Sequence, residues 1–287
     1  MPELPEVDAL AHHLREHLHG ARLAHIDLAS LSALKTFDPP LQALEGQRVA
    51  VVTRRGKFLV LQFEDAALVI HFARAGWLQW RDNVPDSPVK PGKGPLALRT
   101  RFVNDDGEAR GGFDLTEHGT TKGLAVYVVR DPEDVPGITR LGPDALEVSP
   151  DDLAGILAAH PRGHIKNVLR DQAALSGIGN AYSDEILHRA HLSPFTPAGG
   201  VDAVELHRAI AETLTEARTR AMDSEVARLK SEKREGLRVH GRQGQECPVC
   251  GDVIQSVSFA DRSLEYCPTC QTGGTPLADR RLSRLLK

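Results

Sequence analysis

Apolar residues near the start of the chain recur at helical spacing. Val7, Leu10, Leu14 and Leu18 lie three or four positions apart, polar residues occupy most of the positions between them, and Gly20 follows as a stop signal. The pattern predicts an amphipathic helix that begins within the first few residues. We therefore expect the N-terminus to be tethered to a helix that packs against a core.

Between residues 22 and 130 the pattern changes to short aliphatic and β-branched runs. The clearest runs lie at 49–63, 67–73 and 123–129, and glycine, aspartate and proline interrupt them. They predict a mostly antiparallel β domain. The proline-rich stretch 83–95 is typical of a surface loop within that domain, because strand-like runs resume beyond it.

Helical patterns follow a boundary segment at 130–152, which is rich in proline, glycine and acidic residues. Ser149 precedes Pro150 as an N-cap precedes the first residue of a helix, and residues 202–222 form a long amphipathic pattern. The chain order is therefore a β domain, a helical domain and a cysteine-rich segment.

A helical hairpin is expected between residues 165 and 195. A first, apolar helix is predicted to end at Ser176 and Gly177, and a Gly-Ile-Gly turn then precedes a second helix that begins at Asn180. Backbone N–H groups at such a helix start bind phosphate, and Lys166 would add positive charge. A helical hairpin without a ligand explains the same pattern.

The composition is ordinary for a soluble globular protein, and 287 residues allow two or three compact units. The formal net charge of -4 excludes a polycation that coats nucleic acid, so a DNA partner has to be met by a local patch. Basic character lies in the C-terminal half: residues 161–287 carry 18 basic and 16 acidic side chains, whereas residues 1–160 carry 17 and 23.

Nothing in the sequence indicates a membrane. No apolar run approaches the roughly 20 residues that cross a bilayer. The first residues also lack the basic and apolar regions of a signal peptide. We expect a cytoplasmic protein with no membrane partner.

Four cysteines form two C-x-x-C pairs, Cys247 with Cys250 and Cys267 with Cys270. Each pair presents two thiolates to one tetrahedral ion, so the spacing predicts a structural zinc site. Four thiolates leave no open coordination position, and the ion should therefore stabilise a small hairpin and take no part in catalysis. The alternative, a redox dithiol, needs only one pair and a thioredoxin-like context that this sequence lacks.

The N-terminus offers a second candidate for chemistry. Met1 before a small residue such as Pro2 is commonly removed, which would expose a secondary amine next to Glu3 and Glu6. An α-amino group titrates near 8 and a lysine near 10.4, so the terminal amine is the readier imine-forming nucleophile, with Glu3 as a proton donor. Taken alone, these residues equally fit ordinary helix-start chemistry.

Four blocks of sequence, in this order, resemble one family. They are MPELPEV at 1–7, RRGKFL at 54–59, LRDQAALSGIGNAYSDEIL at 169–187, and RVHGRQGQECPVC followed by DRSLEYCPTCQ between 238 and 271. The chain resembles the formamidopyrimidine-DNA glycosylases of the Fpg/Nei class, over residues 1 to about 271. The first block is closer to the formamidopyrimidine type than to the endonuclease VIII type.

The resemblance implies a multidomain α+β fold. It consists of an N-terminal β-sandwich with flanking helices, a helical helix–two-turn–helix domain and a C-terminal zinc-finger β-hairpin, with DNA bound between the domains. On this chain we expect the catalytic β-sandwich at 1–132, the helical DNA-binding domain at 133–240, the zinc finger at 241–273 and a basic tail at 274–287. The family implies a monomer that acts on damaged or abasic DNA, associated with the nucleoid.

The family's catalytic roles match residues of this chain. The resemblance implies that the amine of Pro2 attacks C1′ of the damaged nucleoside, that Glu3 is the acid at the sugar oxygen and that Glu6 is a supporting carboxylate. Lys57, on a β-turn, is implied as a catalytic and phosphate-contacting cation.

Four further positions carry the residue types that contact DNA phosphates in the family: His71, Lys166, Asn180 and Arg262. Phosphate contacts carry no sequence information, which suits an enzyme that searches any DNA. Alternatives remain for two of them. His71 lies in an apolar strand pattern and fits a core histidine, and Arg262 fits a solvated residue of the zinc hairpin.

Three segments depart from the family pattern. Arg74 occupies the position of a methionine that fills the hole left by the extruded base, and residues 114–126 replace the loop with the partner Arg/Phe pair. Residues 223–237 are strongly charged and lack the Gly-Thr-Thr cluster of the lid over the base. We expect Arg74 to contact the orphaned base; an exposed β-strand arginine is the alternative.

The favoured function is a bifunctional DNA glycosylase and abasic-site lyase of base excision repair, which removes oxidised or ring-opened bases and nicks the strand by β- and δ-elimination. The second hypothesis is an abasic-site lyase or a glycosylase for oxidised pyrimidines, single-stranded or crosslinked DNA, because the wedge residues are missing. A paralogue that binds damaged DNA without turnover is the third, and the intact residues at positions 2, 3, 6 and 57 argue against it. A zinc-ribbon interaction protein of unrelated fold is a remote fourth.

Overall fold

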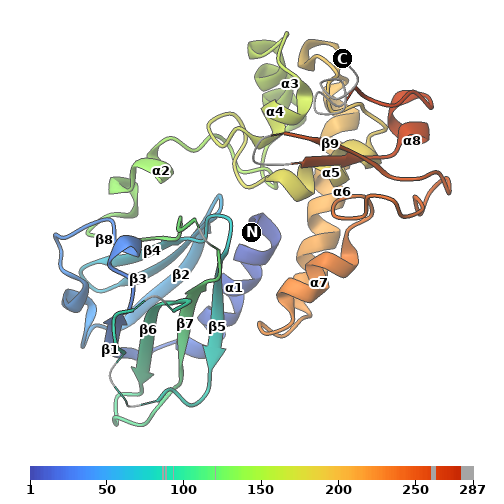
Figure 1. Ribbon diagram of the computed structural model, residues 1–287. Helices are drawn as coiled ribbons and strands as arrows, with labels where there is room; N and C mark the ends of the chain where they lie inside the picture. Colours follow the sequence, from blue (N-terminus) through green and yellow to red (C-terminus); the bar gives the residue numbers. More distant parts are fainter. Residues whose placement is uncertain (86, 88, 93, 120, 260–262, 279–287) are drawn as a thin grey trace. The chain divides into compact units, whose positions relative to one another are not determined.

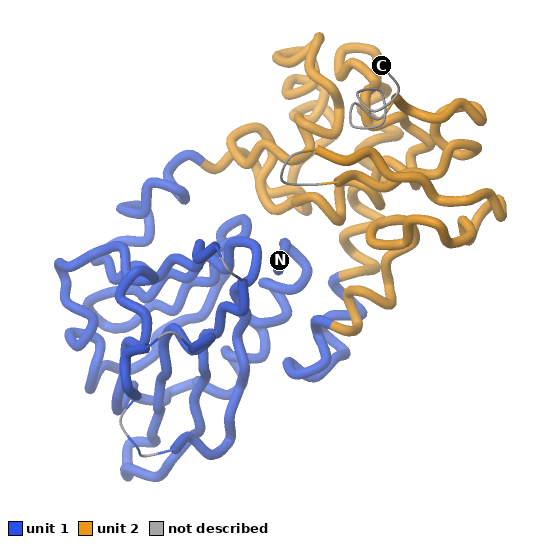
Figure 2. Tube along the Cα trace, in the orientation of Figure 1, with its two compact units in different colours: residues 1–140, 218–230 blue, residues 141–217, 231–287 orange. Residues whose placement is uncertain are grey.

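The structure is a computed structural model that describes residues 1–85, 87, 89–92, 94–119, 121–259 and 263–278. The chain packs into two compact units (Figure 2). Unit 1 contains residues 1–140 and 218–230, and unit 2 contains residues 141–217 and 231–287. Among the described residues, no helix is both long and apolar enough to cross a membrane.

Unit 1 is built on two four-stranded antiparallel sheets (Figure 1). The first has the strand order β1 (Arg22–Leu28), β6 (Leu96–Val103), β7 (Gly112–Glu117), β5 (Gly76–Arg81). The second has the order β2 (Val49–Arg55), β3 (Phe58–Phe63), β4 (Ala67–His71), β8 (Ala125–Val129). Apolar residues of both sheets share one hydrophobic core, which makes unit 1 a β-sandwich.

The predicted N-terminal helix is confirmed as α1 (Leu4–Leu18), which packs against β2 and β3. The side chains of Val7, Leu10, Leu14 and Leu18 are fully buried in the sandwich core. The helical spacing of these residues thus orients one face of α1 toward the sheet. Burial of that face fixes where the first residues of the chain lie.

Short helical segments of unit 1 lie between β1 and β2 and after β8, and those between β1 and β2 contribute Ala33, Leu41 and Leu44 to the core. They are η1 (Leu31–Ala33), η2 (Leu41–Leu44), η3 (Pro132–Asp134) and α2 (Pro136–Thr139). The end of the long helix α6 (Ala203–Met222) and the residues after it, up to 230, also belong to this unit. Ala221, Val226 and Leu229 are buried in the same core as α1.

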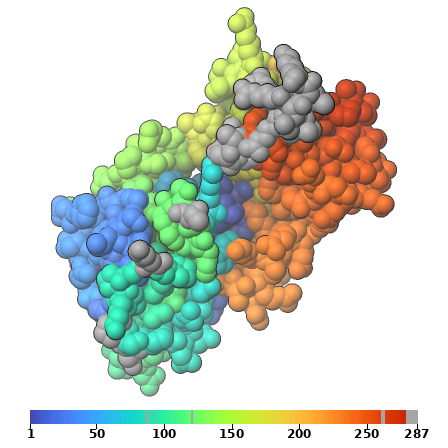
Figure 3. All heavy atoms as spheres, in the orientation of Figure 1, coloured from blue at the N-terminus to red at the C-terminus, as the bar shows by residue number. Residues whose placement is uncertain are grey.

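Unit 2 is a helical unit that carries a small β-hairpin (Figure 1). Its helices are α3 (Pro150–Ala159), α4 (Ile165–Arg170), α5 (Asn180–Arg189), η4 (Ala198–Gly200), most of α6 (Ala203–Met222) and most of α7 (Leu229–Gly236). The hairpin consists of β9 (Gln255–Ser258) and β10 (Ser263–Tyr266), and α8 (Pro268–Thr272) follows it. In the space-filling view, the residues around α8 form part of the surface of unit 2 (Figure 3).

The helix signals of unit 2 are confirmed at three places and wrong at one. Helix α5 begins at Asn180, as predicted. Ser149 caps α3, since its Oγ accepts the N–H of Asp152 at 3.1 Å, and α6 is the predicted long helix. However, α4 ends at Arg170 and does not extend to Ser176. The side chain of Gln172 bonds to main-chain groups at both ends of the following turn, so it holds this segment as a loop.

The predicted fold class is confirmed: a mixed α+β protein with a β-sandwich, a helical unit and a C-terminal β-hairpin. The division into units by packing places residues 218–230 with the β-sandwich. The boundaries expected at 132, 240 and 273 remain a prediction.

The substitution Leu14→Ala tests whether α1 is part of the sandwich core. A truncation of this fully buried side chain should cost about 2–5 kcal/mol. Leu31→Ala is the matched control, because Leu31 is 78% exposed. Both tryptophans, Trp77 and Trp80, lie in β5, so urea unfolding followed by tryptophan fluorescence monitors unit 1. An unchanged midpoint for Leu14→Ala would show that α1 is not part of the folded core.

Candidate functional site

The N-terminal candidates lie at the start of α1. Pro2, Glu3 and Glu6 are all buried, and Glu3 is only 2% exposed. Glu3 is the N-cap residue of the helix, and its backbone N–H donates to Oε2 of Glu6 at 2.7 Å. Glu6 therefore caps the helix, as the alternative interpretation held, and this bond also fixes the backbone directly after Pro2. Met1, which precedes Pro2 in the chain, is exposed.

Lys57 lies in the turn between β2 and β3, and it is only 7% exposed. Arg54 connects this turn to α1. Its Nη1 donates to the carbonyl of Gly56 at 3.0 Å, and its Nε lies 3.6 Å from Oδ1 of Asp8. Because Asp8 is on the first turns of α1, the structure ties the turn that carries Lys57 to the helix that begins at the N-terminus.

His71 is the last residue of β4 and pairs in register with Phe58 of β3. Its ring lies 4.7 Å from the Phe58 ring, and the side chain is half-buried. Burial and, to a smaller extent, the charge of Lys57 together lower the pKa of His71 to about 4. The imidazole is therefore neutral at pH 7, so His71 can contact a phosphate as a hydrogen-bond donor and not as a cation.

Arg74 lies in the tight turn between β4 and β5, where it is exposed. Arg74 is exposed, as the alternative held, but it lies in a turn and not in a β-strand. The turn closes where Gly76 N–H donates to the carbonyl of Phe72 at 2.9 Å, and Ala73 has a positive φ of 50°. A Cβ on Gly76 would lie 2.3 Å from that carbonyl oxygen, so only glycine allows this turn and the presentation of Arg74 at its tip.

The segment 114–126, which replaces the family's Arg/Phe loop, is closed by a buried carboxylate. Glu117 is at the end of β7 and is 4% exposed. Its Oε1 accepts the backbone N–H of Gly123 at 2.7 Å and that of Leu124 at 2.9 Å. The side chain of Glu117 on β7 therefore holds the backbone at the end of this loop.

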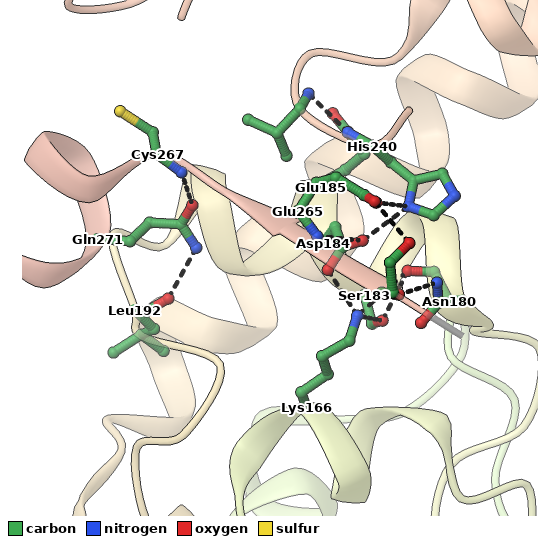
Figure 4. Close-up of polar contacts among 12 residues, drawn as sticks. Lys166, Asn180, Ser183, Asp184, Glu185, Leu192, His240, Glu265, Cys267 and Gln271 are labelled. Carbon is green, nitrogen blue, oxygen red and sulfur yellow. Dashed lines mark hydrogen bonds and ion pairs between the residues drawn. The ribbon is translucent and has the colours of Figure 1, made fainter. Parts of the chain in front are cut away.

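Unit 2 contains a buried ionic network (Figure 4). Lys166 on α4 is 5% exposed, and its Nζ donates to Oδ1 of Asp184 at 2.6 Å and to Oγ of Ser183 at 2.8 Å. Its ammonium thus faces acceptors on α5. The contact of Lys166 with a DNA phosphate stays a prediction, whereas its contribution to packing α4 against α5 is direct.

His240 joins the same network from the segment after α7. Its Nδ1 donates to Oδ2 of Asp184 at 2.7 Å and lies 2.9 Å from Oε2 of Glu265 on β10. Burial opposes the positive charge, but the hydrogen bonds to the two carboxylates outweigh it and raise the pKa of His240 to about 9. Asp184, His240 and Glu265 are residue types that bind metal ions and lie close together. The ammonium of Lys166 beside Asp184 already provides the positive charge that a metal ion would bring.

Glu185, next to Asp184, fixes the backbone of the segment that carries His240. It is 5% exposed and accepts the backbone N–H groups of Arg238, Val239 and His240 at 2.7–3.0 Å. Burial raises the pKa of Glu185. The sequence interpretation missed the roles of these two adjacent acids; the structure shows that both are buried on α5, where carboxylates require partners.

Asn180 connects α5 to the hairpin. Its Nδ2 donates to the carbonyl of Ser263 on β10 at 2.8 Å. Its Oδ1 is buried and accepts no hydrogen bond from any part of the chain that the structure describes. Asn180 also lines a cavity of about 480 Å³ in unit 2, together with Lys166, His164, Arg170 and Phe259. Arg262 lies outside the described residues.

The four cysteines form one cluster whose sulfur atoms all lie within 4.8 Å of one another. The Sγ–Sγ distance is 3.4 Å between Cys250 and Cys267 and 3.9 Å between Cys247 and Cys270. A tetrahedral zinc ion with bonds of about 2.3 Å places its sulfurs about 3.8 Å apart, whereas a disulfide needs about 2.05 Å. The donor set therefore fits the predicted structural zinc.

Gln271 connects the zinc site to the helical part of unit 2 (Figure 4). Its Oε1 accepts the N–H of Cys267 and its Nε2 donates to the carbonyl of Leu192, both at 2.9 Å. A zinc ion bound by the cysteines would therefore stabilise the hairpin. Residues of both hairpin strands, β9 and β10, line the cavity.

Three family models match the chain in succession. They are the formamidopyrimidine-DNA glycosylase N-terminal domain at residues 1–116, the formamidopyrimidine-DNA glycosylase H2TH domain at 141–228, and the zinc finger found in FPG and IleRS at 244–273.

Two relatives illustrate the similarity in sequence. The formamidopyrimidine-DNA glycosylase of Gloeobacter violaceus is 34% identical, over 94% of this chain and 98% of its own length. An uncharacterized formamidopyrimidine-DNA glycosylase-like protein of Mycobacterium tuberculosis is 60% identical over 150 residues, which cover 51% of this chain and 94% of that protein.

Solved structures show the same fold. MutM in complex with DNA that contains carbocyclic 8-oxo-G has a TM-score of 0.78 at 23% identity, over 94% of this chain and all of that one. The Lactococcus lactis formamidopyrimidine-DNA glycosylase bound non-covalently to DNA with an AP site has a TM-score of 0.77 at 24% identity, over 94% of this chain and 99% of that one.

The pKa of His240 predicts how the stability of unit 2 depends on pH. Because the folded state raises this pKa from 6.5 to about 9, the stabilisation is complete below about pH 6.5 and is lost as the pH rises through about 9. The shift corresponds to about 3 kcal/mol. Thermal unfolding followed by far-UV circular dichroism should show a pH slope in this window that His240→Gln flattens. A slope that the substitution leaves unchanged would contradict the assignment.

Proposed function

The chain belongs to the formamidopyrimidine-DNA glycosylase family, and we propose that it excises damaged bases through its N-terminal proline and cleaves the resulting abasic strand. It is a DNA glycosylase of base excision repair, and abasic-site lyase activity is a general property of the family. The observation that carries the residue assignment is the buried cluster of Pro2, Glu3 and Glu6 at the start of α1.

The proposed reaction begins after removal of Met1. The lone pair of the Pro2 nitrogen attacks C1′, the bond from C1′ to the base breaks, and the base leaves with a proton. Glu3 donates a proton to the ring oxygen as the sugar opens to an iminium. Loss of a C2′ proton then expels the 3′ phosphate by β-elimination, and δ-elimination expels the 5′ phosphate. Lys57, on the turn tied to α1, supplies positive charge for a phosphate.

His71 of unit 1, together with residues of unit 2 and its zinc hairpin, would hold the DNA backbone. The proposed phosphate contacts are His71, Lys166, Asn180 and Arg262. Asn180 is supported by its place in the cavity wall, beside Lys166. Zinc bound by the four cysteines supplies structural stability only. We further propose that the enzyme acts as a monomer at the nucleoid.

The residues at the positions of the family's wedge methionine and lid favour a second function. Arg74 replaces the wedge methionine, and the charged segment 223–237 is anchored, because Val226 and Leu229 are buried in the core of unit 1. Lys233 of the same segment lies 4.5 Å from the centre of the Tyr182 ring. This anchored segment stands where the family has a lid over the base, and the change supports action on abasic sites, pyrimidine lesions or single strands.

Borohydride trapping with a matched pair of variants tests the proline chemistry. In Pro2→Gly the second residue stays small, so Met1 is removed and an amine remains at the same position; Pro2→Leu retains Met1 and displaces the amine. We expect wild type and Pro2→Gly to form a covalent adduct with abasic DNA, and Pro2→Leu to lose trapping by at least about two orders of magnitude. Absence of trapping in the wild type would leave the non-catalytic binding protein as the explanation.

Cleavage of a lesion panel separates the two substrate hypotheses. The panel holds 8-oxoguanine opposite cytosine, formamidopyrimidine, an oxidised pyrimidine and an abasic site, each in duplex and single strand. Activity on oxidised purines in duplex supports the first function. Activity confined to abasic sites, pyrimidine lesions or single strands supports the second.

Arg74→Ala tests whether this residue contacts the orphaned base. Loss of one stacking or hydrogen-bonding contact of about 1–3 kcal/mol should lower cleavage of duplex substrate about tenfold or more and leave single-strand cleavage unchanged. Arg130→Ala is the control, because Arg130 is an exposed arginine of the same unit. Equal duplex activity of both variants and wild type would remove this role of Arg74.

A further inference from the structure

His188 brings helix α5 into direct contact with the zinc site. Its side chain is only 1% exposed, and its Nε2 lies 3.3 Å from Sγ of Cys247. His188 lies in the last turn of α5, a helix that begins at Asn180 and packs against β10 and α8. The contact therefore joins this helix to a sulfur that lies 59 positions later in the chain.

Cys247 lies in apolar surroundings, where a thiolate needs hydrogen-bond donors. It is 2% exposed and packs in one cluster with Val239, Ile254 and Cys267. Four thiolates around one divalent ion leave an excess of negative charge, and a buried charge without polar partners is costly. The donors that reach the sulfurs therefore affect how strongly the site retains its ion.

Two other cysteines receive their donors from the zinc segment itself. The backbone N–H of Cys270 donates to Sγ of Cys267 at 3.5 Å, and the backbone N–H of Asp252 donates to Cys250. Both donors lie close in the chain to the sulfur that they contact. Cys247 differs, because His188 is a side chain from outside the zinc finger matched at 244–273.

The surroundings of the two ring nitrogens of His188 determine which nitrogen carries the proton. A neutral imidazole has one N–H and one nitrogen lone pair. Nδ1 is buried and has no hydrogen-bond partner in the part of the chain that the structure describes. A proton on Nδ1 would leave a buried N–H unsatisfied and would turn the Nε2 lone pair toward an anionic sulfur. A proton on Nε2 instead gives an N–H···S bond and leaves only a lone pair without a partner.

We propose that His188 is a positioning residue for zinc, whose Nε2–H donates a hydrogen bond to the Cys247 thiolate and thereby slows release of the ion. The bond compensates part of the negative charge of the four thiolates and holds the Cys247 sulfur in the cluster. Loss of such a partner typically lowers metal affinity about 10–100-fold. This role concerns zinc retention and does not depend on which DNA lesion the enzyme excises.

Zinc release from the full-length protein tests this role. The zinc-loaded protein is mixed with an excess of the chromogenic chelator 4-(2-pyridylazo)resorcinol, and the release rate is measured at constant pH. His188→Phe keeps a flat ring but removes both nitrogens, so we expect release about 10–100-fold faster than in wild type. His188→Gln places an amide N–H near the position of the histidine Nε2, so its release rate should stay close to that of wild type.

His191→Asn is the matched control. His191 lies two residues after the end of α5, and its Nδ1 lies 3.2 Å from the carbonyl oxygen of Cys270, so it contacts the zinc segment through the main chain. Its φ of 54° is positive, a conformation that asparagine adopts more readily than most residues. This variant should release zinc at the wild-type rate. A wild-type rate in His188→Phe, or equally fast release in His188→Phe and either of the other two variants, would overturn the proposal.

The absorption spectrum of the cobalt-substituted protein separates the hydrogen bond from a packing role. Loss of an N–H···S bond leaves a more electron-rich thiolate, so the sulfur-to-cobalt charge-transfer band should move to longer wavelength in His188→Phe. The band should stay in place in His188→Gln and His191→Asn. An unmoved band in His188→Phe would show that the side chain only fills space.

Nitrogen NMR of the histidine side chains in the zinc-loaded wild type keeps the test decisive if His188→Phe fails to fold. We expect the proton of His188 on Nε2, and the signals that disappear in His188→Gln assign this residue. A proton on Nδ1 would overturn the proposal, because the ring could not then donate to Cys247.

Discussion

The reacting group of the proposed chemistry is the chain's own N-terminus, so only the packing of the helix that follows can hold it in place. The buried face of α1 supplies that constraint, because its leucines and valine are fully enclosed by the sandwich. The Glu6 cap fixes the backbone after Pro2, and Asp8 connects α1 to the turn of Lys57 through Arg54. One apolar helix face thus places both the amine and the cation assigned to the same reaction.

Unit 2 depends on a different interaction, the compensation of charges that its fold buries. Lys166, Asp184, His240 and Glu265 come from four segments, and each charge faces an opposite one. Removal of one member would leave an uncompensated buried charge, which is costly. The network therefore holds the hairpin against α4 and α5, and these elements form the wall of the cavity in which the DNA backbone is proposed to bind.

Local signals in the sequence predicted a large part of this structure. The helical spacing of α1, the strand-like run at 49–63, the cap at Ser149 and the two cysteine pairs all depend on neighbours close in the chain. The end of α4 was predicted wrongly because Gln172 holds the loop through contacts at both of its ends.

The buried network could not be predicted, since Lys166, His240 and Glu265 are distant from Asp184 in sequence and only the fold brings them together. Arg74 is an intermediate case: the sequence marked it as unusual, but only the folded turn between β4 and β5 shows that it is exposed at a tip. The catalytic roles came from resemblance to the family, and burial of residues 2, 3 and 6 adds a physical reason why their positions are fixed.

The most direct test of the central claim is peptide mass spectrometry of the protein after borohydride reduction with abasic DNA and proteolysis. The account predicts that the sugar remnant is attached to the nitrogen of a peptide that begins at Pro2, with Met1 absent. A remnant on Lys57, or on any peptide that retains Met1, would contradict it.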